Sequence, residues 1–494
     1  MKLQLTTRTS FFAKYQSAVV GILMLLSGGC MVGPKYQRAA APVSPAYKET
    51  PQGWKQAQPN DGALRGKWWE IYNDPELNRM EEQVNISNQN VLSAESHYRE
   101  AKDAVRVVRS GLFPTLTAGL SVTSSRAQSA SVNIPINASA SGARTIYDLP
   151  VDFSYQADVW GGIRRSIQES AAVAQATFAQ LENARLSYQS LLAQNYFQLH
   201  GGDTEQDLLE RTVKSYEDAL QLTKERFEAG VVSGADVAQA QTQLAGARAQ
   251  LQELGVTRAQ YEHAIAILIG KPPSELSVSF STIQAEPPEI PVGVPSDLLE
   301  RRPDIAAAER QMEGANAQIG VVTAAYYPTV TLSASGGLQS SSITTWLSWP
   351  SRFWSVGAQA AETFFDAGRR RAQVGEAQAA YDATVADYRQ TVLTGFQQVE
   401  DNLAALRVLE EVAKTEQDAI QAAQQSLDIS TYQYKAGTVG YLQVITAQQA
   451  LLGAQSAAVG ILSRRMVASA LLIEALGGGW DTSHLPTAGA VAAK

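Results

Sequence analysis

An internal repeat constrains this chain more than any other feature, because three short motifs occur twice in the same order. Arg-Phe-Glu-Ala-Gly at 226–230 matches Gln-Tyr-Lys-Ala-Gly at 433–437, about 207 residues later. Two further pairs recur at separations of roughly 206 to 214 residues. They are 113–117 with 327–331, and 160–164 with 366–370. Repetition at one spacing indicates a single large body built from two equivalent halves.

Composition excludes several classes of function. The chain has 494 residues and a net charge of −8, and it has no basic cluster that would indicate nucleic acid as a partner. A mild acidic excess mainly favours solubility, although acidic groups lining a cavity would suit cationic or neutral cargo. No nucleophile motif, phosphate loop or dinucleotide motif appears, so we expect no enzyme and no cofactor. We also expect no metal site, because the four histidines lie far apart in the sequence: His97, His200, His263 and His484.

The N-terminus has the pattern of a targeting segment. Basic residues precede an apolar run at 18–26, which is followed by Ser-Gly-Gly-Cys at 27–30. This arrangement resembles a bacterial lipoprotein signal, so we expect residues 1–29 to be removed and Cys30 to be lipidated. The apolar run is too short to span a membrane. The alternative is an ordinary signal peptide cleaved elsewhere, with Cys30, the single cysteine of the chain, playing no part.

The first repeat, expected at 67–270, changes from helical to strand periodicity and back. Residues 30–66 are rich in proline, glycine and alanine and indicate an extended N-terminal segment. A helix is expected from Pro75 to Val108, ending before Pro114. Alternating apolar and small polar residues then predict two strands, at 115–123 and 151–159, in a hairpin spanning about 114–160.

The second repeat, expected at 301–477, follows the same order, with a hairpin at about 328–364. Between the repeats, the proline-rich residues 271–300 indicate a crossover linker, and 478–494 form a C-terminal tail. After each hairpin a proline-free stretch predicts one very long helix, at 162–229 and at 368–436, roughly 100 Å at 1.5 Å per residue. Each ends at Ala-Gly and is followed by a partner helix, at 235–269 and at 442–476.

These patterns predict an oligomer. Helices of this length need neighbouring helices to bury their apolar positions. Four strands with one apolar face cannot close a membrane barrel, since the smallest barrels have eight strands. We therefore expect a homotrimer with a twelve-stranded β-barrel, four strands from each chain, continued by a tube of long helical hairpins. The fold class is mainly α with a membrane β-barrel portion.

Several motifs carry a resemblance to a known family. They are Trp68-Trp69 before Asn-Asp-Pro at 73–75, Leu-Glu-Arg-Arg-Pro-Asp-Ile at 299–305, Ala-Asn-Ala-Gln-Ile-Gly at 315–320, Phe-Phe-Asp-Ala-Gly-Arg at 364–369 and Tyr-Lys-Ala-Gly at 434–437. With them, the chain after its signal resembles the TolC-like outer membrane efflux factors, in the lipoprotein branch that is paired with RND pumps. The resemblance implies a trimer with a mixed equatorial region. It also implies an exit duct that works with a periplasmic adaptor and an inner-membrane RND-type transporter.

The resemblance also implies a gate at the periplasmic tip, near the two Ala-Gly turns. Tyr434 occupies the position of a gate tyrosine and Asp236 that of an aspartate in the first tip. The second tip departs from the family, because Gln443 and Thr446 stand where relatives place aspartates, and Val439 where an arginine can occur. We expect closure to depend on packing and on contacts between Tyr434 and Asp236 of different subunits. The alternative is that both residues only cap and pack helices.

The function expected from these features is a passive export duct for small molecules across the periplasm and the outer membrane. The protein would be anchored by lipid and would contact outer membrane lipid along its barrel. Three alternatives remain: the outer membrane component of type I protein secretion, a metal-ion efflux channel, or a non-transporting protein that uses its helices for interactions.

Overall fold

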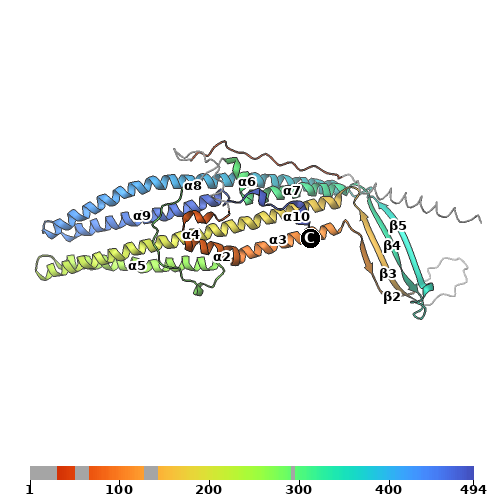
Figure 1. Cartoon of the computed structure of the whole chain (residues 1–494), viewed down its shortest axis with the longest axis horizontal. Coiled ribbons are helices and arrows are strands. Elements are labelled where there is room, and N and C mark those ends of the chain that lie inside the picture. Colours follow the sequence, from red (N-terminus) through yellow and green to blue (C-terminus); the bar gives the residue numbers. More distant parts are fainter. Residues whose placement is uncertain (1–30, 50–65, 127–142, 291–294, 494) are drawn as a thin grey trace, which may run out of the picture.

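The computed structural model describes residues 31–49, 66–126, 143–290 and 295–493. Long helices lie side by side in an elongated body, and a β-sheet projects from one end of it (Figure 1). At the opposite end the helices turn back in two hairpins. The two ends of the molecule therefore differ in structure and in surface.

The first repeat contains the following elements in chain order: the 3₁₀ helix η1 (Trp68–Tyr72), α2 (Pro75–Ser87), α3 (Gln89–Ser110), β1 (Thr115–Ala118), β2 (Ser121–Ser125), β3 (Arg144–Ala157), α4 (Gly162–Glu228) and α5 (Gly234–Leu268). Between the repeats lie two short 3₁₀ helices, η2 (Pro273–Glu275) and η3 (Pro295–Asp297). The second repeat contains α6 (Leu298–Arg301), α7 (Pro303–Ala324), β4 (Thr329–Ser340), the 3₁₀ helix η4 (Trp349–Ser351), β5 (Arg352–Ala361), α8 (Arg369–Lys435) and α9 (Tyr441–Ala475). The chain then continues through the 3₁₀ helix η5 (Thr482–His484) to α10 (Ala488–Ala492).

The long helices of the two repeats have equal lengths. α4 and α8 each have 67 residues, and α5 and α9 each have 35. Each long helix ends where a glycine takes a positive φ, Gly230 at 77° and Gly437 at 75°, as is usual for a helix C-terminal stop. The predicted bounds of these four helices are confirmed to within one residue.

The strands form one antiparallel sheet in the order β1-β3-β4-β5, and β2 also pairs with β3. β1 and β2 pair with different parts of β3, so together they occupy a single strand position. The sheet therefore has four strand positions. β3 and β4 are long and pair from Tyr147 with Ser340 to Ala157 with Val330.

Three predicted elements are wrong in detail. The helix expected from Pro75 to Val108 is broken at Asn88, where the backbone is extended and the side chain caps α3 by accepting from two backbone N–H groups. The strand expected at 115–123 is broken after Ala118, where the N–H of Gly119 bonds back to Pro150 O. β3 is also longer than predicted and begins at Arg144.

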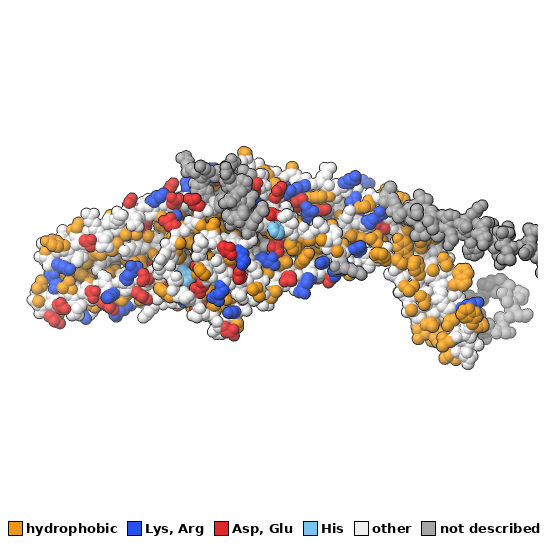
Figure 2. Space-filling model, viewed as in Figure 1, with side chains coloured by type: hydrophobic (Ala, Val, Ile, Leu, Met, Phe, Trp, Pro, Cys, Tyr) orange, Lys and Arg blue, Asp and Glu red, His pale blue; other side chains and the backbone are white. Residues whose placement is uncertain are grey.

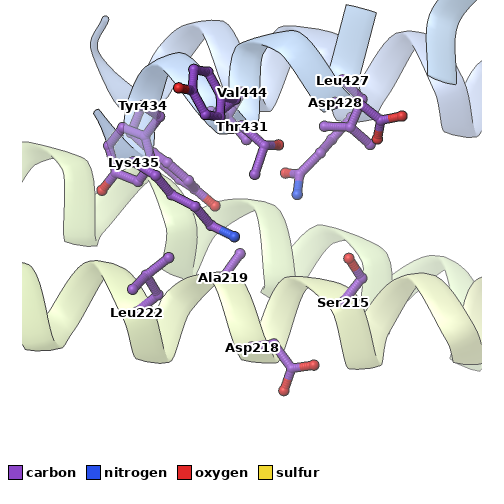
Figure 3. A pocket seen from close by; sticks show the side chains of 13 residues that line it. Ser215, Asp218, Ala219, Leu222, Leu427, Asp428, Thr431, Tyr434, Lys435 and Val444 are labelled. Carbon is purple, nitrogen blue, oxygen red and sulfur yellow. The ribbon is translucent and has the colours of Figure 1, made fainter. Parts of the chain in front are cut away.

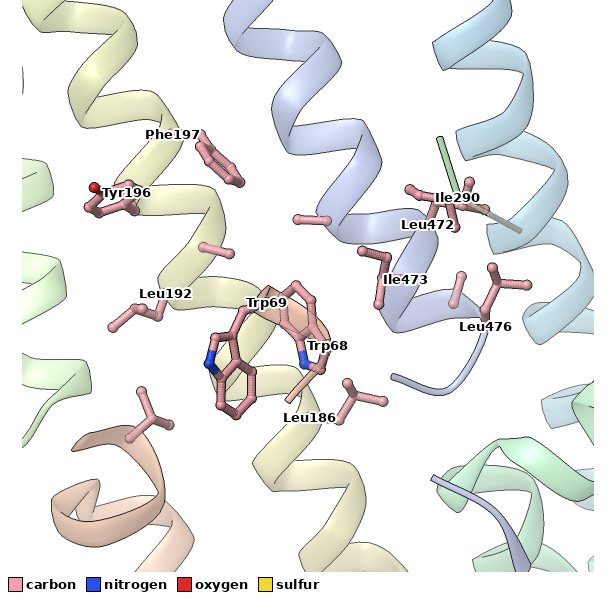
Figure 4. Packing of buried hydrophobic residues seen from close by; sticks show 14 of the residues in the cluster. Trp68, Trp69, Leu186, Leu192, Tyr196, Phe197, Ile290, Leu472, Ile473 and Leu476 are labelled. Atoms are coloured by element: carbon pink, nitrogen blue, oxygen red, sulfur yellow. The ribbon is translucent and has the colours of Figure 1, made fainter. Parts of the chain in front are cut away.

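The main core lies midway along the body, where the two repeats meet. Trp68 and Trp69 are almost fully buried and lie between α4 and α9 (Figure 4). They pack edge to face with ring centroids 5.9 Å apart, an arrangement favoured by the aromatic quadrupole. The indole nitrogen of Trp68 donates to Gln189 in α4 at 3.3 Å. This core holds the short α2 helix against both long hairpins.

The residues beyond α9 fold back along the body. Trp480 packs against Ala306 and Ala307 of α7, and Val491 in α10 is fully buried against α3 and α4. α9 is long and apolar enough, by composition alone, to cross a membrane. Its contacts with α8 and α4 show that it belongs to the helical body instead.

Candidate functional site: the two-faced sheet and the helical tip

The projecting sheet has one apolar and one polar face. Side chains alternate between faces along a strand. The pairing register places apolar residues opposite apolar residues and polar residues opposite polar residues. Paired positions on one face are Leu116 with Phe153, Tyr155 with Leu332, and Ala334 with Val356. Paired positions on the other face are Thr117 with Asp152, Gln156 with Thr331, and Ser335 with Ser355. Strands of this type form membrane barrels whose outer face meets lipid and whose inner face meets water.

The apolar face is exposed. Leu116 is 71% exposed, Val356 75% and Trp354 79%. Hydrophobic side chains cover the sheet, whereas acidic and basic side chains are scattered over the helical body (Figure 2). An exposed apolar surface of this extent marks a membrane or a protein interface rather than a water-facing surface.

The tips of the two helical hairpins are joined at Tyr434. This side chain, in the last turn of α8, is 3% exposed, and its hydroxyl donates to Thr223 of α4 over 3.4 Å. Its ring lies 5.2 Å from that of Tyr441 at the start of α9. Tyr434 therefore packs the second hairpin against the first within one chain.

Arg226, in the last turn of α4, makes the stronger link between the tips. Its guanidinium lies 4.6 Å from the centre of the Tyr434 ring and donates to the carbonyl oxygens of Tyr434 at 2.9 Å and Lys435 at 3.3 Å. These are last-turn carbonyls of α8, at the helix end that the macrodipole makes negative and a cation stabilises; Tyr434 O also accepts from the Gly437 N–H at 3.0 Å. Sequence reasoning missed Arg226. The sequence did contain a signal for it, because the matching position in the second repeat is Gln433 and the two tips therefore differ there.

Asp236 lies in the first turn of α5 and forms a capping box with Ser233. Its carboxylate accepts from the Ser233 N–H at 3.0 Å, and the Ser233 hydroxyl accepts from the Asp236 N–H at 3.4 Å. Within the described part of one chain, Asp236 and Tyr434 share no hydrogen bond. Contact between them across subunits stays a prediction.

The other tip positions singled out in the sequence lie in the first turns of α9 and in the turn that precedes it. Gln443 and Thr446 are exposed, and Val439 is partly exposed. The Thr446 hydroxyl donates to Leu442 O at 2.9 Å within the helix. Their side chains are therefore available on the surface of the second tip.

A cavity of about 470 Å³ separates α4 from the second hairpin near the tips. Figure 3 shows Ala219 and Leu222 of α4 facing Tyr434 and Lys435 of α8 across it, with Asp428 at one side. Beside this cavity the hairpins pack directly, because Tyr216 and Leu220 of α4 are buried in one cluster with Tyr434, Val444 and Ile445 of the second hairpin. The cavity therefore lies along a packed seam between the hairpins.

A buried polar cluster fixes the crossover linker to the first repeat. Asp203, fully buried in α4, accepts from Arg258 at 2.8 Å, from the Ser281 N–H at 3.1 Å and from His200 Nδ1 at 3.0 Å. Burial alone would raise the pKa of the Asp203 carboxyl, but these three hydrogen bonds outweigh burial and lower it.

A second buried acid has no such support. Glu81 in α2 is fully buried, and neither carboxylate oxygen has a hydrogen-bond partner among the described residues. Burial therefore raises the pKa of Glu81 well above its usual value. Within the described ranges, no group of three or more His, Cys, Asp or Glu side chains is placed to hold a metal ion.

The N-terminal segment 31–49 lies along the second repeat, as expected for an extended strap. Its first residues sit where the sheet meets the helices: Val32 N–H donates to Trp160 O at 3.2 Å, and Arg165 donates to the carbonyl oxygens of Val32 and Gly33. At its far end, the carboxylate of Glu400 in α8 accepts from the backbone N–H groups of residues 48 and 49. Cys30 lies just outside the described residues.

Comparison with known proteins places this architecture in a family. A family model described as outer membrane efflux protein matches residues 82–271 and 294–478, one stretch in each half of the chain. The probable efflux pump outer membrane protein TtgC of Pseudomonas putida is 30% identical over 470 residues, covering 93% of this chain and 95% of the relative. The pyoverdine export outer membrane protein OpmQ of Pseudomonas aeruginosa is 29% identical, covering 95% and 98%.

Solved structures agree. The outer-membrane channel OprN has a TM-score of 0.82 at 29% identity, covering 91% of this chain and all of that one. The Campylobacter jejuni CmeC outer membrane channel has a TM-score of 0.83 and covers 92% of this chain and 96% of its own length, at 23% identity. That second likeness supports the fold alone.

The fold and the two-faced sheet define a channel-type protein of the bacterial outer membrane. The chain belongs to the outer membrane efflux protein family. It is therefore an outer membrane efflux channel and not an enzyme. The matches do not favour the alternatives of protein secretion, metal-ion efflux or a non-transporting interaction protein.

Proposed function

We propose that three copies of this chain form a continuous duct through which an efflux pump exports small molecules. The observation that carries this proposal is the two-faced sheet with unpaired edges. β1 and β2 lie at one edge and β5 at the other, and neither edge has a further partner strand among the described residues. In lipid, unpaired backbone groups cost several kcal/mol each, so open edges must close.

Three copies supply twelve strand positions, an even number suited to a closed membrane barrel. The apolar face would meet lipid and the face with Asp152, Thr331 and Ser355 would line the water-filled lumen. The repeats at 67–270 and 301–477 would then act as six equal wall segments, separated by the linker at 271–300. The body beyond the barrel would be a helical tube.

Exposed apolar side chains on the long helices support this assembly. Val256 and Ile267 on α5 are 59% and 63% exposed, and Leu393 and Ile429 on α8 are 46% and 50% exposed. α4 and α9 lie between these two helices, because α4 contacts both α5 and α9. α5 and α8 are therefore the outer helices of each protomer, and neighbouring copies would cover these exposed apolar side chains, which lie beyond the first turns of α8.

We also propose that Cys30 carries a lipid anchor. Met31 packs closely against Gly161, where the sheet gives way to α4. The described chain therefore begins at the level where the sheet meets the helices, which suits a lipid on the preceding residue, with residues 1–29 removed as the signal. The N-terminal segment 31–49 would hold the lipid anchor at a fixed height on the barrel.

The partners proposed for the duct are a periplasmic adaptor and an inner-membrane RND-type transporter, since membership of an efflux pump implies a tripartite assembly. Relatives are named for the efflux of toluene and antibiotics and for the export of pyoverdine. This range favours small organic molecules as cargo. Closure of the tip would involve Asp236, Tyr434 and Gln443, together with Arg226.

The test of the proposed function combines mass and conductance. The full chain, extracted in detergent, should have the mass of three protomers by native mass spectrometry and should conduct ions in a planar bilayer. A protein that stays monomeric and never conducts would overturn the proposal. Mass spectrometry of the N-terminal peptide would identify an acylated Cys30 or an unmodified one, and so decides the anchor separately.

A further inference from the structure

The first turn of α8 has an unusual charge pattern. Arg369, Arg370 and Arg371 follow one another there with no acidic residue among them. Positive charge at a helix N-terminus is opposed by the helix macrodipole, which favours anions at that end. A sequence that breaks a local rule in this way points to a function that compensates for it.

Among the described residues, only one of the three arginines has hydrogen-bond or ion-pair partners for its side chain. Arg370 bonds to the Asp366 carboxylate at 2.6 Å and to the carbonyl oxygen of Ala325 at 3.3 Å, and it lies over the ring of Tyr326. Arg369 and Arg371 are exposed, and their side chains make no hydrogen bond or ion pair within the described part of the chain. Two guanidinium groups therefore face outward next to the free end of a helix.

The internal repeat shows what the matching place does in the first half. Arg164 matches Arg370 and is likewise paired with an aspartate, Asp158, at 3.0 Å. Arg165 matches Arg371 but is 7% exposed, because it donates to two carbonyl oxygens of the N-terminal segment. The first-repeat arginine is thus occupied by acceptors from the chain itself, whereas Arg371 has none.

Apolar side chains flank the free arginines on the side of the sheet. Phe364 and Phe365, which lie between β5 and α8, are 91% and 86% exposed, more than any other large hydrophobic residue described. They follow the exposed strand β5, which ends at Ala361. Hydrophobic and basic side chains meet at this end of the helical body (Figure 2).

A cavity lies on the other side of the arginines. It has a volume of about 560 Å³ and lies between the N-terminal segment, α7 and α8. Val374, one helical turn after Arg371, lines it, together with Ile319, Tyr381 and the cationic residue Lys35. Lys35 is exposed and has no ion pair within the described residues. Arg369, Arg371 and Lys35 form a basic patch. It has exposed phenylalanines on the side of the sheet and a partly apolar cavity on the side of the helical body.

We propose that Arg369, Arg371 and Lys35 bind the headgroup of an anionic phospholipid, with Phe364 and Phe365 inserted among its acyl chains. The inference rests on the proposed function, because it takes the sheet to be the membrane-spanning part. Guanidinium groups match phosphate oxygens in charge and geometry, and phenylalanine side chains next to basic residues insert at the boundary between headgroups and acyl chains. The first repeat provides no second patch, so a trimer would bind three such lipids and not six.

The experiment counts bound lipid on the full chain. Delipidated protein in detergent is titrated with phosphatidylglycerol and with phosphatidylcholine, and native mass spectrometry measures the lipid bound to each oligomer. The wild type should prefer phosphatidylglycerol, with up to three molecules per trimer. R369Q/R371Q should lower the affinity for phosphatidylglycerol about thirtyfold, because two basic side chains near anionic lipid together contribute about 2 kcal/mol. The affinity for phosphatidylcholine should not change.

Two variants serve as controls. R369K/R371K keeps both charges and should retain most of the preference, and R211Q/K214Q removes two exposed charges far along α4 and should bind lipid like the wild type. Equal binding of the two lipids by the wild type, or undiminished phosphatidylglycerol binding by R369Q/R371Q, would overturn the inference. Conductance in a planar bilayer is measured in parallel. A wild type that conducts without lipid preference disproves only the lipid site, whereas a wild type that never conducts disproves the duct.

Discussion

Asn88 and Arg302 occupy equivalent positions in the two repeats and tie the same two elements together by different chemistry. Each is the residue before a short helix, α3 or α7. The amide of Asn88 donates to Leu268 O at the end of α5 over 2.8 Å. The guanidinium of Arg302 donates to Ala475 O at the end of α9 over 2.9 Å. In both repeats the start of the short helix satisfies a carbonyl at the end of the long hairpin.

Arg302 and Asn88 should contribute differently to stability. Arg302 is 6% exposed and also holds Asp304 through two hydrogen bonds, so Arg302→Met removes the cation from the Asp304 carboxylate and the side-chain donor from the Ala475 carbonyl. We expect a loss of about 3 kcal/mol, against roughly 1 to 2 kcal/mol for Asn88→Ala. Melting temperatures in detergent would rank the variants. Arg211→Gln, an exposed control, should hardly change the melting temperature. An equal fall in melting temperature for Arg302→Met and Asn88→Ala would contradict the ranking.

Neighbouring residues on β5 test which face of the sheet meets lipid. Val356 points to the apolar face and Ser355 to the polar face. Val356→Arg should reduce the amount of assembled protein in the outer membrane, because an arginine facing lipid costs about 2 to 4 kcal/mol near the midplane. Ser355→Arg should assemble normally and lower the cation conductance. The reverse pattern, with Ser355→Arg failing to assemble, would mean that the faces are exchanged.

At the tip, Arg226 should matter more than the hydroxyl of Tyr434. Arg226→Gln removes the cation over the Tyr434 ring and the cap on α8, so the tip should loosen and single-channel conductance should rise. Tyr434→Phe removes only one long hydrogen bond and should have a smaller effect. Asp236→Ala removes a helix cap worth about 1 kcal/mol and tests the contact between subunits. If neither Asp236→Ala nor Tyr434→Phe alters conductance, the proposed contact between these residues is wrong.

Glu81 should make stability depend on pH. Burial raises its pKa in the folded protein well above the ordinary glutamate value of 4.5, so the unfolded chain loses its proton first as pH rises. The contribution of Glu81 is therefore fully present below about pH 4.5 and is lost as pH rises through the folded pKa. Glu81→Gln should melt higher than wild type at about pH 8.5 and nearly equally at about pH 4.5. Parallel melting curves for the two proteins across this range would rule out a buried, protonated Glu81.

Asp203 should act in the opposite direction. Its folded pKa is lowered, so its stabilisation is present above the unfolded value and disappears as pH falls through the folded pKa. Asp203→Asn should lower the melting temperature at neutral pH by weakening the hold on Arg258, His200 and the linker. The difference from wild type should shrink as the solution is acidified. Limited proteolysis within 276–290 would show whether the linker has detached.

Most of the helical fold could be predicted because its signals are local. The absence of proline and the Ala-Gly stops determined four helices to within a residue of their observed ends. The break at Asn88 was missed because no glycine or proline marks it. An asparagine occurs both inside surface helices and as a helix cap. The cap is favoured here because Asn88 also donates to the end of α5, which is close in space but distant in the sequence.

The tip was harder to predict for a similar reason. Tyr434 and Asp236 were selected from a family resemblance, whereas Arg226 bonds to carbonyls about two hundred residues away. No local pattern reveals that the ends of α4 and α8 are neighbours. The repeat does contain a signal. The matching positions are Arg226 in one copy and Gln433 in the other, and only the arginine can supply a positive charge.

The matched lengths of the long helices restrict how this protein can change. With 67 and 35 residues in each hairpin, both tips reach the same depth. An insertion of seven residues into one helix would force its partner out of register, and a whole hairpin lengthened alone would protrude by about 10 Å at 1.5 Å per residue. A longer or shorter reach therefore requires coordinated changes at four places in one gene, so the distance that the protein spans is harder to alter than its surface chemistry.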